Sequence, residues 1–161
     1  MSIKKGVFKK TSTTKFNHSW SDNLLPYCQQ PESHPDSIIS FDTQTVIIKD
    51  QYPKAKYHYL VMPRISIQLT HLTKSHLDLL QHMYTVAMTF ISQDTFKAIN
   101  FQIGFHAVPS MKQLHMHVIS TDFISPSLKN KKHYLSFTTT FFQPYQNVID
   151  MIEKSNGVYV S

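Results

Sequence analysis

The chain has 161 residues, a formal net charge of +6 at neutral pH and 41% hydrophobic residues. This length suits one hydrophobic core rather than two, and the hydrophobic content is that of a folded domain, so we expect one domain and exclude a disordered chain. No apolar run approaches the roughly 20 residues of a membrane span, and no apolar signal segment follows the lysine-rich N-terminus. The composition therefore excludes a membrane partner, and the positive charge predicts an anionic one.

Cysteine content indicates the compartment. Cys28 is the one cysteine in the sequence, which excludes an intrachain disulfide. Such a composition is typical of a reducing environment, so we expect a nuclear or cytoplasmic protein.

The first part of the chain carries few signals of regular structure. Residues 1–19 are basic and rich in serine and threonine, and we expect a flexible tail ahead of a domain over 20–161. A short helix is predicted over 20–25, with Ser19 or Ser21 as its N-cap. Three prolines within 26–37 predict a loop.

The rest of the chain alternates between strand and helix patterns. Runs of β-branched and aromatic residues predict strands, and apolar residues at helical spacing predict helices. The expected elements are strands over 43–49 and 57–62, a helix over 74–92 capped by Thr73, strands over 100–107 and 114–120, and a helix around 148–152. Antiparallel strands with flanking helices predict the α+β class.

Two histidines lie two residues apart in the most informative stretch of the sequence. In a strand, residues i and i+2 share a face, so His115 and His117 point the same way. Leu114, Met116 and Val118 then point the other way, into a core. We therefore expect one dry face and one histidine-bearing surface.

The spacing alone leaves several interpretations open. His106 and Ser110 lie just upstream, next to Pro109, and this group suggests phosphate chemistry. A His-x-His pair is equally an arrangement of metal ligands, although the sequence has no CxxC or HExxH motif to support a metal site. Two unrelated surface histidines are a third interpretation.

Longer motifs give these histidines a context. The run 106–123, HAVPSMKQLHMHVISTDF, is followed by SPSLKNKKH at 125–133, and IKDQYPKAKYHYLVMP occupies 48–63. This sequence resembles the aprataxin branch of the histidine-triad (HIT) superfamily, which removes AMP from 5′-adenylated DNA ends. The resemblance covers roughly 20–152 and implies the HIT fold, an antiparallel sheet of about five strands flanked by helices.

The resemblance also implies catalytic roles. His115 is expected to be the nucleophile that attacks the α-phosphorus of the adenylate, forming an adenylyl-histidine intermediate that water hydrolyses to AMP. His106 takes the position of the acid that assists the leaving group. His117 and His58 are expected to orient the nucleophile and contact phosphate oxygens, and Ser110 to stabilise charge on the phosphorus centre. The implied mechanism requires no metal and no cofactor.

Further residues are expected to bind the substrate. Asp50 occupies the place of the acid that holds the ribose hydroxyls, although a turn-capping role before Tyr52 explains it equally well. The residues assigned to the nucleotide are Asp50, Ser110, Met111, Gln113 and Leu24. The residues assigned to DNA are Trp20, which either stacks on a terminal base or packs in the core, and Lys54, Lys129, Lys131 and Lys132.

The sequence departs from the family pattern at three places. Gln113 stands where the first triad histidine is expected, so it can donate hydrogen bonds but cannot carry a proton, and we expect retuned activity. Lys56 replaces an arginine, which keeps the charge and loses the bidentate geometry. The sequence has no cysteine besides Cys28 with which to build the C-terminal zinc finger that aprataxins usually carry, so we expect a catalytic domain alone.

Three functions follow from these observations. We expect a monomeric hydrolase of 5′-adenylated nicked DNA, or of RNA–DNA junctions, that releases AMP. A general HIT hydrolase of small adenylates, such as AMP-lysine or dinucleoside polyphosphates, is the second hypothesis. A non-catalytic nucleic-acid-binding module, in which Gln113 marks decay of the site, is the third.

Overall fold

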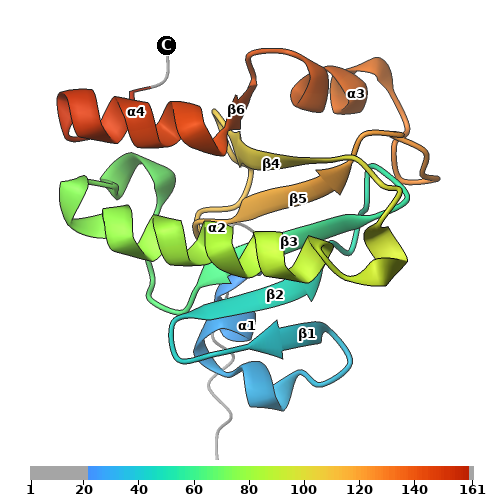
Figure 1. The fold of residues 1–161 in the computed structure, drawn as a ribbon, viewed down its shortest axis with the longest axis horizontal. Coiled ribbons are helices and arrows are strands. Elements are labelled where there is room, and N and C mark those ends of the chain that lie inside the picture. The colour runs from blue at the N-terminus through green and yellow to red at the C-terminus, as the bar shows by residue number, and fades with distance from the viewer. Residues whose placement is uncertain (1–21, 160–161) are drawn as a thin grey trace, which may run out of the picture.

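The structure, a computed structural model, describes residues 22–159. The predicted tail over 1–19 and Trp20 lie outside this range. Within it, six strands form one antiparallel sheet in the order β1-β2-β3-β5-β4-β6 (Figure 1). The strands are β1 Ile38–Phe41, β2 Thr45–Lys49, β3 His58–Pro63, β4 Phe101–His106, β5 Met116–Ser120 and β6 Phe142–Pro144, and the α-helices are α1 Leu25–Gln29, α2 Leu77–Ile91, α3 Lys131–Thr138 and α4 Tyr145–Ser155. The α+β class is confirmed, with one strand more than the expected five or so.

The four central strands lie where the alternating patterns placed them. The two edge strands, β1 and β6, have four and three residues, which is too short for a periodic signal. They are recognisable only through their pairing, β1 with β2 and β6 with β4. A three-dimensional partner, rather than a local pattern, makes these segments strands.

The predicted helix boundaries need two corrections at the N-terminal end. The helix expected over 20–25 begins outside the described residues, and from residue 22 onward the first α-helix is α1, which lies mostly in the segment predicted to be a loop. Pro26 lies in its first turn, where the missing N–H costs no hydrogen bond, so this proline starts the helix. Pro31 likewise opens a short 3-10 turn.

The helices after β3 differ from the predicted ones in length, and one of them was not predicted. The expected 74–92 helix consists of a 3-10 turn, Lys74–His76, followed by α2, and the predicted Thr73 N-cap is present. The helix expected around 148–152 extends over the whole of α4. No pattern predicted α3, which begins after Asn130, whose side chain accepts the backbone N–H of His133 at 2.9 Å.

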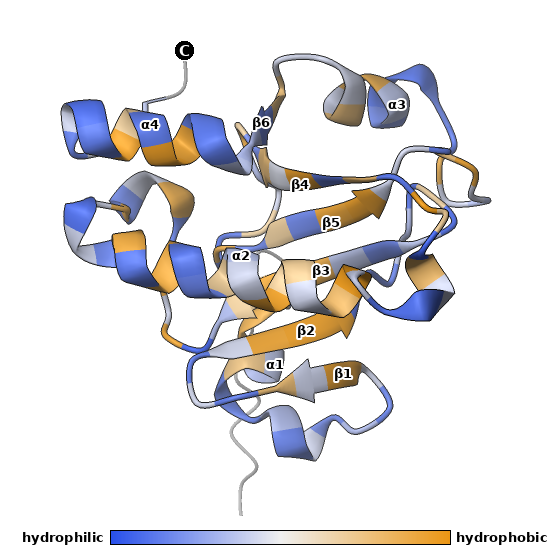
Figure 2. Ribbon diagram, viewed as in Figure 1, coloured by the Kyte–Doolittle hydropathy of each residue, from blue (hydrophilic) through white to orange (hydrophobic). Residues whose placement is uncertain are grey.

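The main core lies between the sheet and the helices α2 and α4, which cover one face (Figure 1). Hydrophobic and hydrophilic residues alternate along both helices (Figure 2), and their buried members belong to this core, namely Leu80, Met83 and Ala87 of α2 and Val148, Ile149 and Ile152 of α4. The predicted inward residues Leu114, Met116 and Val118 all belong to this core, with exposed fractions of 2% or less. The alternation in this strand is confirmed.

The opposite face of the sheet carries two smaller apolar clusters. One packs around α1 and contains Leu24, Cys28, Val46, Ile48, Leu60 and Met62. The other packs under α3 and contains Ala55, Ile119, Phe137 and Phe142. His117 pairs with Leu60 and His58 pairs with Ile119, so the histidines occupy this face between the two clusters. None of the helices in 22–159 is both long and apolar enough to cross a membrane.

Candidate active site

Four histidines from three adjacent strands meet on one face of the sheet. His58 opens β3, His106 ends β4, His115 immediately precedes β5, and His117 is its second residue. The ring centroid of His117 lies 5.1 Å from that of His58, 4.4 Å from that of His106 and 5.1 Å from that of His115. The predicted common face of His115 and His117 is confirmed, and His58 and His106 join it.

Three of these histidines are buried and His106 is half-buried, whereas the sequence predicted a histidine-bearing surface. The exposed fractions of His58, His115 and His117 are 1%, 6% and 4%. Phe137 of α3 packs against the cluster, with its ring centroid 4.5 Å from that of His106 and 5.2 Å from that of His117. The expectation failed because α3, the helix that covers this face, had no recognisable pattern.

The hydrogen bond of His115 fixes its tautomer. Its Nδ1 lies 2.8 Å from the backbone carbonyl oxygen of Gln113, an acceptor, so Nδ1 carries the proton and donates it. In a neutral imidazole the other nitrogen, Nε2, then holds a lone pair. His115 is therefore prepared as a nucleophile.

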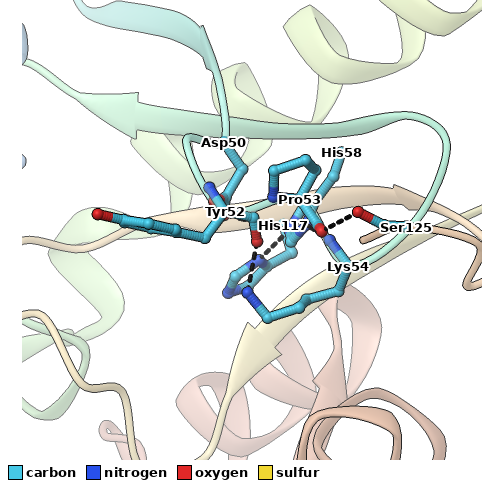
Figure 3. A network of polar contacts seen from close by, with 7 residues as sticks. All are labelled: Asp50, Tyr52, Pro53, Lys54, His58, His117 and Ser125. Carbon is cyan, nitrogen blue, oxygen red and sulfur yellow. Dashed lines mark hydrogen bonds and ion pairs between the residues drawn. The ribbon is translucent and has the colours of Figure 1, made fainter. Parts of the chain in front are cut away.

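A second chain of hydrogen bonds orients His58 and His117 (Figure 3). The backbone N–H of Lys54 donates to Nδ1 of His58 at 3.0 Å, so the proton of His58 sits on Nε2. That Nε2–H lies 2.8 Å from Nδ1 of His117, which must accept it. The proton of His117 is consequently on its own Nε2, which is buried and has no hydrogen-bond partner among the described residues. This series of hydrogen bonds therefore ends in an N–H donor that no described protein group accepts.

Burial keeps the four imidazoles neutral. Burial, with a smaller contribution from the neighbouring His115, lowers the pKa of His58 and that of His106 to about 4. Burial also lowers the pKa of His115, and that of His117 well below its usual range. At neutral pH the site therefore holds neutral bases rather than imidazolium ions.

This neutrality makes stability depend on pH. An unfolded histidine has a pKa near 6.5, whereas folded His58 and His106 titrate near 4. Between these values the unfolded chain binds protons that the folded protein excludes, so stability that is full above pH 6.5 is lost as the pH falls toward 4. We expect each group to cost about 2 kcal/mol between pH 6.5 and 5.

Urea unfolding at pH 7.5 and pH 5 measures this loss. His106→Gln removes one of the titrating groups and should reduce the difference between the two free energies of unfolding. Equal free energies at the two pH values, in the native chain, would contradict the assignment of neutral buried histidines.

Asp50 lies at the edge of this cluster and performs the turn-capping role as well. Its Oδ1 accepts the backbone N–H of Tyr52 at 2.8 Å, while Oδ2 lies 3.4 Å from Nε2 of His58. Asp50 also lines a pocket of about 380 Å³, whose walls are Tyr27, Asp36, Ser37, Ile48, Lys49, Gln51 and Pro53. This volume is in the range of small-molecule sites. Leu24 and Met111 lie in the apolar cluster that contains the Ile48 wall of the pocket.

The structure places Gln113 in a role that the sequence did not predict. Its side-chain amide donates to the carbonyl oxygens of Pro63 at 3.0 Å and Ile65 at 2.8 Å, and its Oε1 accepts the N–H of Ile67 at 3.1 Å. The amide expected to bind phosphate is thus occupied by backbone groups. Ser110 is exposed on the connection between β4 and β5.

Two further residues beside the site, Lys112 and Ser125, were not predicted from the sequence. Lys112 joins His106 and His115 in lining a small hollow of about 10 Å³. Ser125 donates to the carbonyl oxygen of Pro53 at 2.6 Å, which joins two loops of the site. No local signal distinguishes either residue from the other lysines and serines of the sequence.

The lysines assigned to DNA lie in the turn before β3 and around the start of α3. Lys54 is half-buried, and its Nζ donates to the carbonyl oxygen of Tyr52. Burial lowers the pKa of Lys54, against the opposing charge of Asp50. The hydrogen bond from Ser125 to Pro53 holds the segment before α3 against the turn that carries Lys54. Lys129, Lys131 and Lys132 are exposed at the start of α3. Of the residues assigned to DNA, these four lysines lie within the described part of the chain, and Trp20 lies outside it.

The metal interpretation has one set of donors in 22–159. Asp50, His58 and His117 offer ligand atoms that all lie within 4.8 Å of one another. Two nitrogens on one tetrahedral zinc ion are about 3.3 Å apart, whereas the His58 and His117 nitrogens are 2.8 Å apart and joined by a hydrogen bond. These side chains would hold a metal only after that bond opens.

Comparisons with known proteins place the chain in a family. The family model described as scavenger mRNA decapping enzyme C-term binding (DcpS_C) matches residues 25–133. Aprataxin of Gallus gallus is 45% identical over 94% of the chain. An aprataxin-like protein of Saccharomyces cerevisiae is 36% identical over 77% of the chain and 72% of its own length. The chain belongs to the aprataxin branch of this histidine-triad family.

A solved structure supports the same assignment. The aprataxin ortholog Hnt3, crystallised in complex with DNA, matches with a TM-score of 0.69 and 31% identity over 81% of this chain and 76% of that chain. The match confirms the family and the HIT fold inferred from the motifs. The chain covers 47% of the length of the Gallus gallus relative, and thus spans about half of it.

Proposed function

We propose that this chain is a DNA-repair hydrolase that removes AMP from 5′-adenylated DNA ends through an adenylyl-histidine intermediate. The observation that carries the proposal is the bonding of His115, a buried neutral imidazole with a free Nε2 lone pair, among three other histidines. The aprataxin relatives and the Hnt3 complex with DNA support the choice of substrate.

The first step is a displacement at the α-phosphorus of the adenylate. The Nε2 of His115 attacks phosphorus and forms a P–N bond, and the P–O bond to the 5′-phosphate of the DNA breaks. The unpartnered Nε2–H of His117 donates to a non-bridging oxygen, where charge increases in the transition state. A donor already held in place loses little free energy to reorganisation.

His106 handles the proton in both steps. Its pKa of about 4 belongs to a site without an anion, and the charge of a bound phosphate raises it, so the ring can protonate the leaving oxygen. In the second step the neutral ring accepts a proton from water. The hydroxide attacks phosphorus, the P–N bond to His115 breaks, and AMP is released.

The pocket beside Asp50 fits the nucleoside. Its apolar wall, with Ile48 and Pro53, suits the adenine ring, and the Tyr27 ring borders the same space. The Asp50 carboxylate uses one lone pair on Tyr52 and retains others for two vicinal ribose hydroxyls. We therefore assign Asp50 to the ribose, with Leu24 and Met111 supporting the pocket from its apolar cluster.

The lysines beside the site are assigned to the DNA backbone. Lys54 lies in the turn before β3, and Lys129, Lys131 and Lys132 lie around the start of α3. Phosphate contacts from such side chains are independent of sequence and sensitive to salt. A small adenylate has no backbone to occupy them. This difference separates the leading function from a general hydrolase of small adenylates.

The test is a comparison of AMP release from an adenylated nicked duplex and from AMP-lysine. With the Lys131→Gln, Lys132→Gln double variant we expect kcat/KM on the duplex to fall about tenfold or more at physiological salt, with little change on AMP-lysine. Lys154→Gln on α4, which covers the opposite face of the sheet, is the matched control and should alter neither rate.

Other outcomes would select the other functions. An equal loss on both substrates, or faster turnover of AMP-lysine than of the duplex by the native chain, favours a general adenylate hydrolase. DNA binding without release of AMP from either substrate favours a binding module.

A further inference from the structure

Ser125 joins the loop after β5 to the turn before β3. Its hydroxyl donates to the carbonyl oxygen of Pro53 at 2.6 Å, across 72 residues of sequence (Figure 3). Ser125 is partly buried and belongs to no helix or strand. The catalytic assignment above makes no use of it.

The peptide group between Pro53 and Lys54 takes part in two hydrogen bonds, one from Ser125 and one to His58. The carbonyl of Pro53 and the N–H of Lys54 belong to one planar unit, so holding one end fixes the direction of the other. The N–H of Lys54 donates to Nδ1 of His58 at 3.0 Å, and Nε2–H of His58 donates to Nδ1 of His117 at 2.8 Å. A continuous series of donors thus runs from Ser125 to the unpartnered Nε2–H of His117.

We propose that Ser125 is a positioning residue that sets the tautomers of His58 and His117 through the Pro53–Lys54 peptide. An accepted hydrogen bond polarises the peptide and strengthens its N–H as a donor. That stronger donor holds the proton of His58 on Nε2, and the tautomer of His117 follows. The proposal deepens the proposed function and rests on it for its catalytic consequence.

The alternative interpretation is that the Ser125 hydroxyl only holds the loop in place. The hydrogen bonds of Asp122 in the same loop argue against it. Asp122 already anchors this loop, because its Oδ1 accepts the N–H groups of Lys56 at 2.9 Å and Ile124 at 2.7 Å. Its Oδ2 accepts the hydroxyl of Ser120 at 2.6 Å. The loop therefore keeps its anchor when the Ser125 hydroxyl is removed.

The test combines a spectroscopic and a kinetic measurement on the full chain. Histidine ¹⁵N shifts distinguish a protonated ring nitrogen from an unprotonated one, and they report tautomers without any substrate. Ser125→Ala should move the His58 and His117 nitrogens toward averaged values, and kcat for AMP release should fall about fivefold to tenfold with KM little changed. Ser125→Thr, which retains the hydroxyl, should restore both.

Ser127→Ala is the matched control, because the Ser127 hydroxyl makes no hydrogen bond in the described part of the chain. The variant keeps the backbone N–H of Ser127, which donates to the Ser125 hydroxyl oxygen at 3.2 Å. Unchanged histidine shifts and an unchanged kcat in Ser125→Ala would overturn the proposal, as would a loss that Ser125→Thr does not restore. If the native chain releases no AMP, the proposed function fails. The ¹⁵N shifts then still decide whether Ser125 sets the tautomers.

Discussion

Replacing His115 by alanine is expected to reduce AMP release from an adenylated nick by about 10⁴-fold or more. The substitution removes the Nε2 lone pair that the bond from Nδ1 to the Gln113 carbonyl leaves free. The other three histidines keep their positions, but the P–N bond cannot form and direct attack by water is much slower. Single-turnover release of labelled AMP at saturating enzyme measures the chemical step.

The covalent intermediate gives an independent check on this prediction. A brief incubation of the native chain with substrate should yield a protein carrying one adenylyl group, which is stable in alkali and labile in acid, as expected for a phosphoramidate. His115→Ala should not form it. His71→Ala, an exposed histidine on the short turn before α2, is the control and should keep full activity. Undiminished release by His115→Ala would refute the assignment of the nucleophile.

Replacing Gln113 by alanine is expected to lower the free energy of unfolding by about 3 kcal/mol. The side chain is 4% exposed and satisfies three backbone groups in the segment 63–67. Without it, the carbonyl oxygens of Pro63 and Ile65 and the N–H of Ile67 lose these bonds, and leaving such groups unsatisfied is costly. Urea unfolding at pH 7.5 provides the measurement.

Gln113→His restores the residue that the family pattern expects and tests the same geometry. An imidazole has two nitrogens and cannot replace one acceptor and two donors, so we expect a loss smaller than that of the alanine variant but clearly above zero. Gln146→Ala on α4, whose amide bonds only to the exposed Asp150, is the control and should cost less than about 0.5 kcal/mol. A negligible loss in Gln113→Ala would show that these bonds do not support the fold.

The hydrogen bonds of Gln113 also change the role expected for its side chain. The sequence predicted that glutamine would retune activity because it cannot carry a proton. In the structure the side chain faces backbone groups, and the backbone carbonyl, which any residue supplies, orients His115. The expectation about proton transfer therefore gives way to one about support of the loop that precedes the nucleophile.

The sequence by itself determined the centre of the molecule. A period of two in 114–118 fixed which side chains enter the main core and which form the histidine face, because successive residues of a strand alternate sides. The same motifs determined the family. Both inferences rest on patterns contained in a few consecutive residues, and both were confirmed.

Tertiary structure alone decided the state of the histidines. Their burial depends on Phe137, which reaches them from a helix that lacks any periodic signal. The tautomers depend on partners distant in sequence, since His58 and His117 are 59 residues apart and Ser125 lies 72 residues from Pro53. Local patterns carry no record of such contacts, because desolvation and hydrogen-bond direction are set by whatever the completed fold packs against each ring.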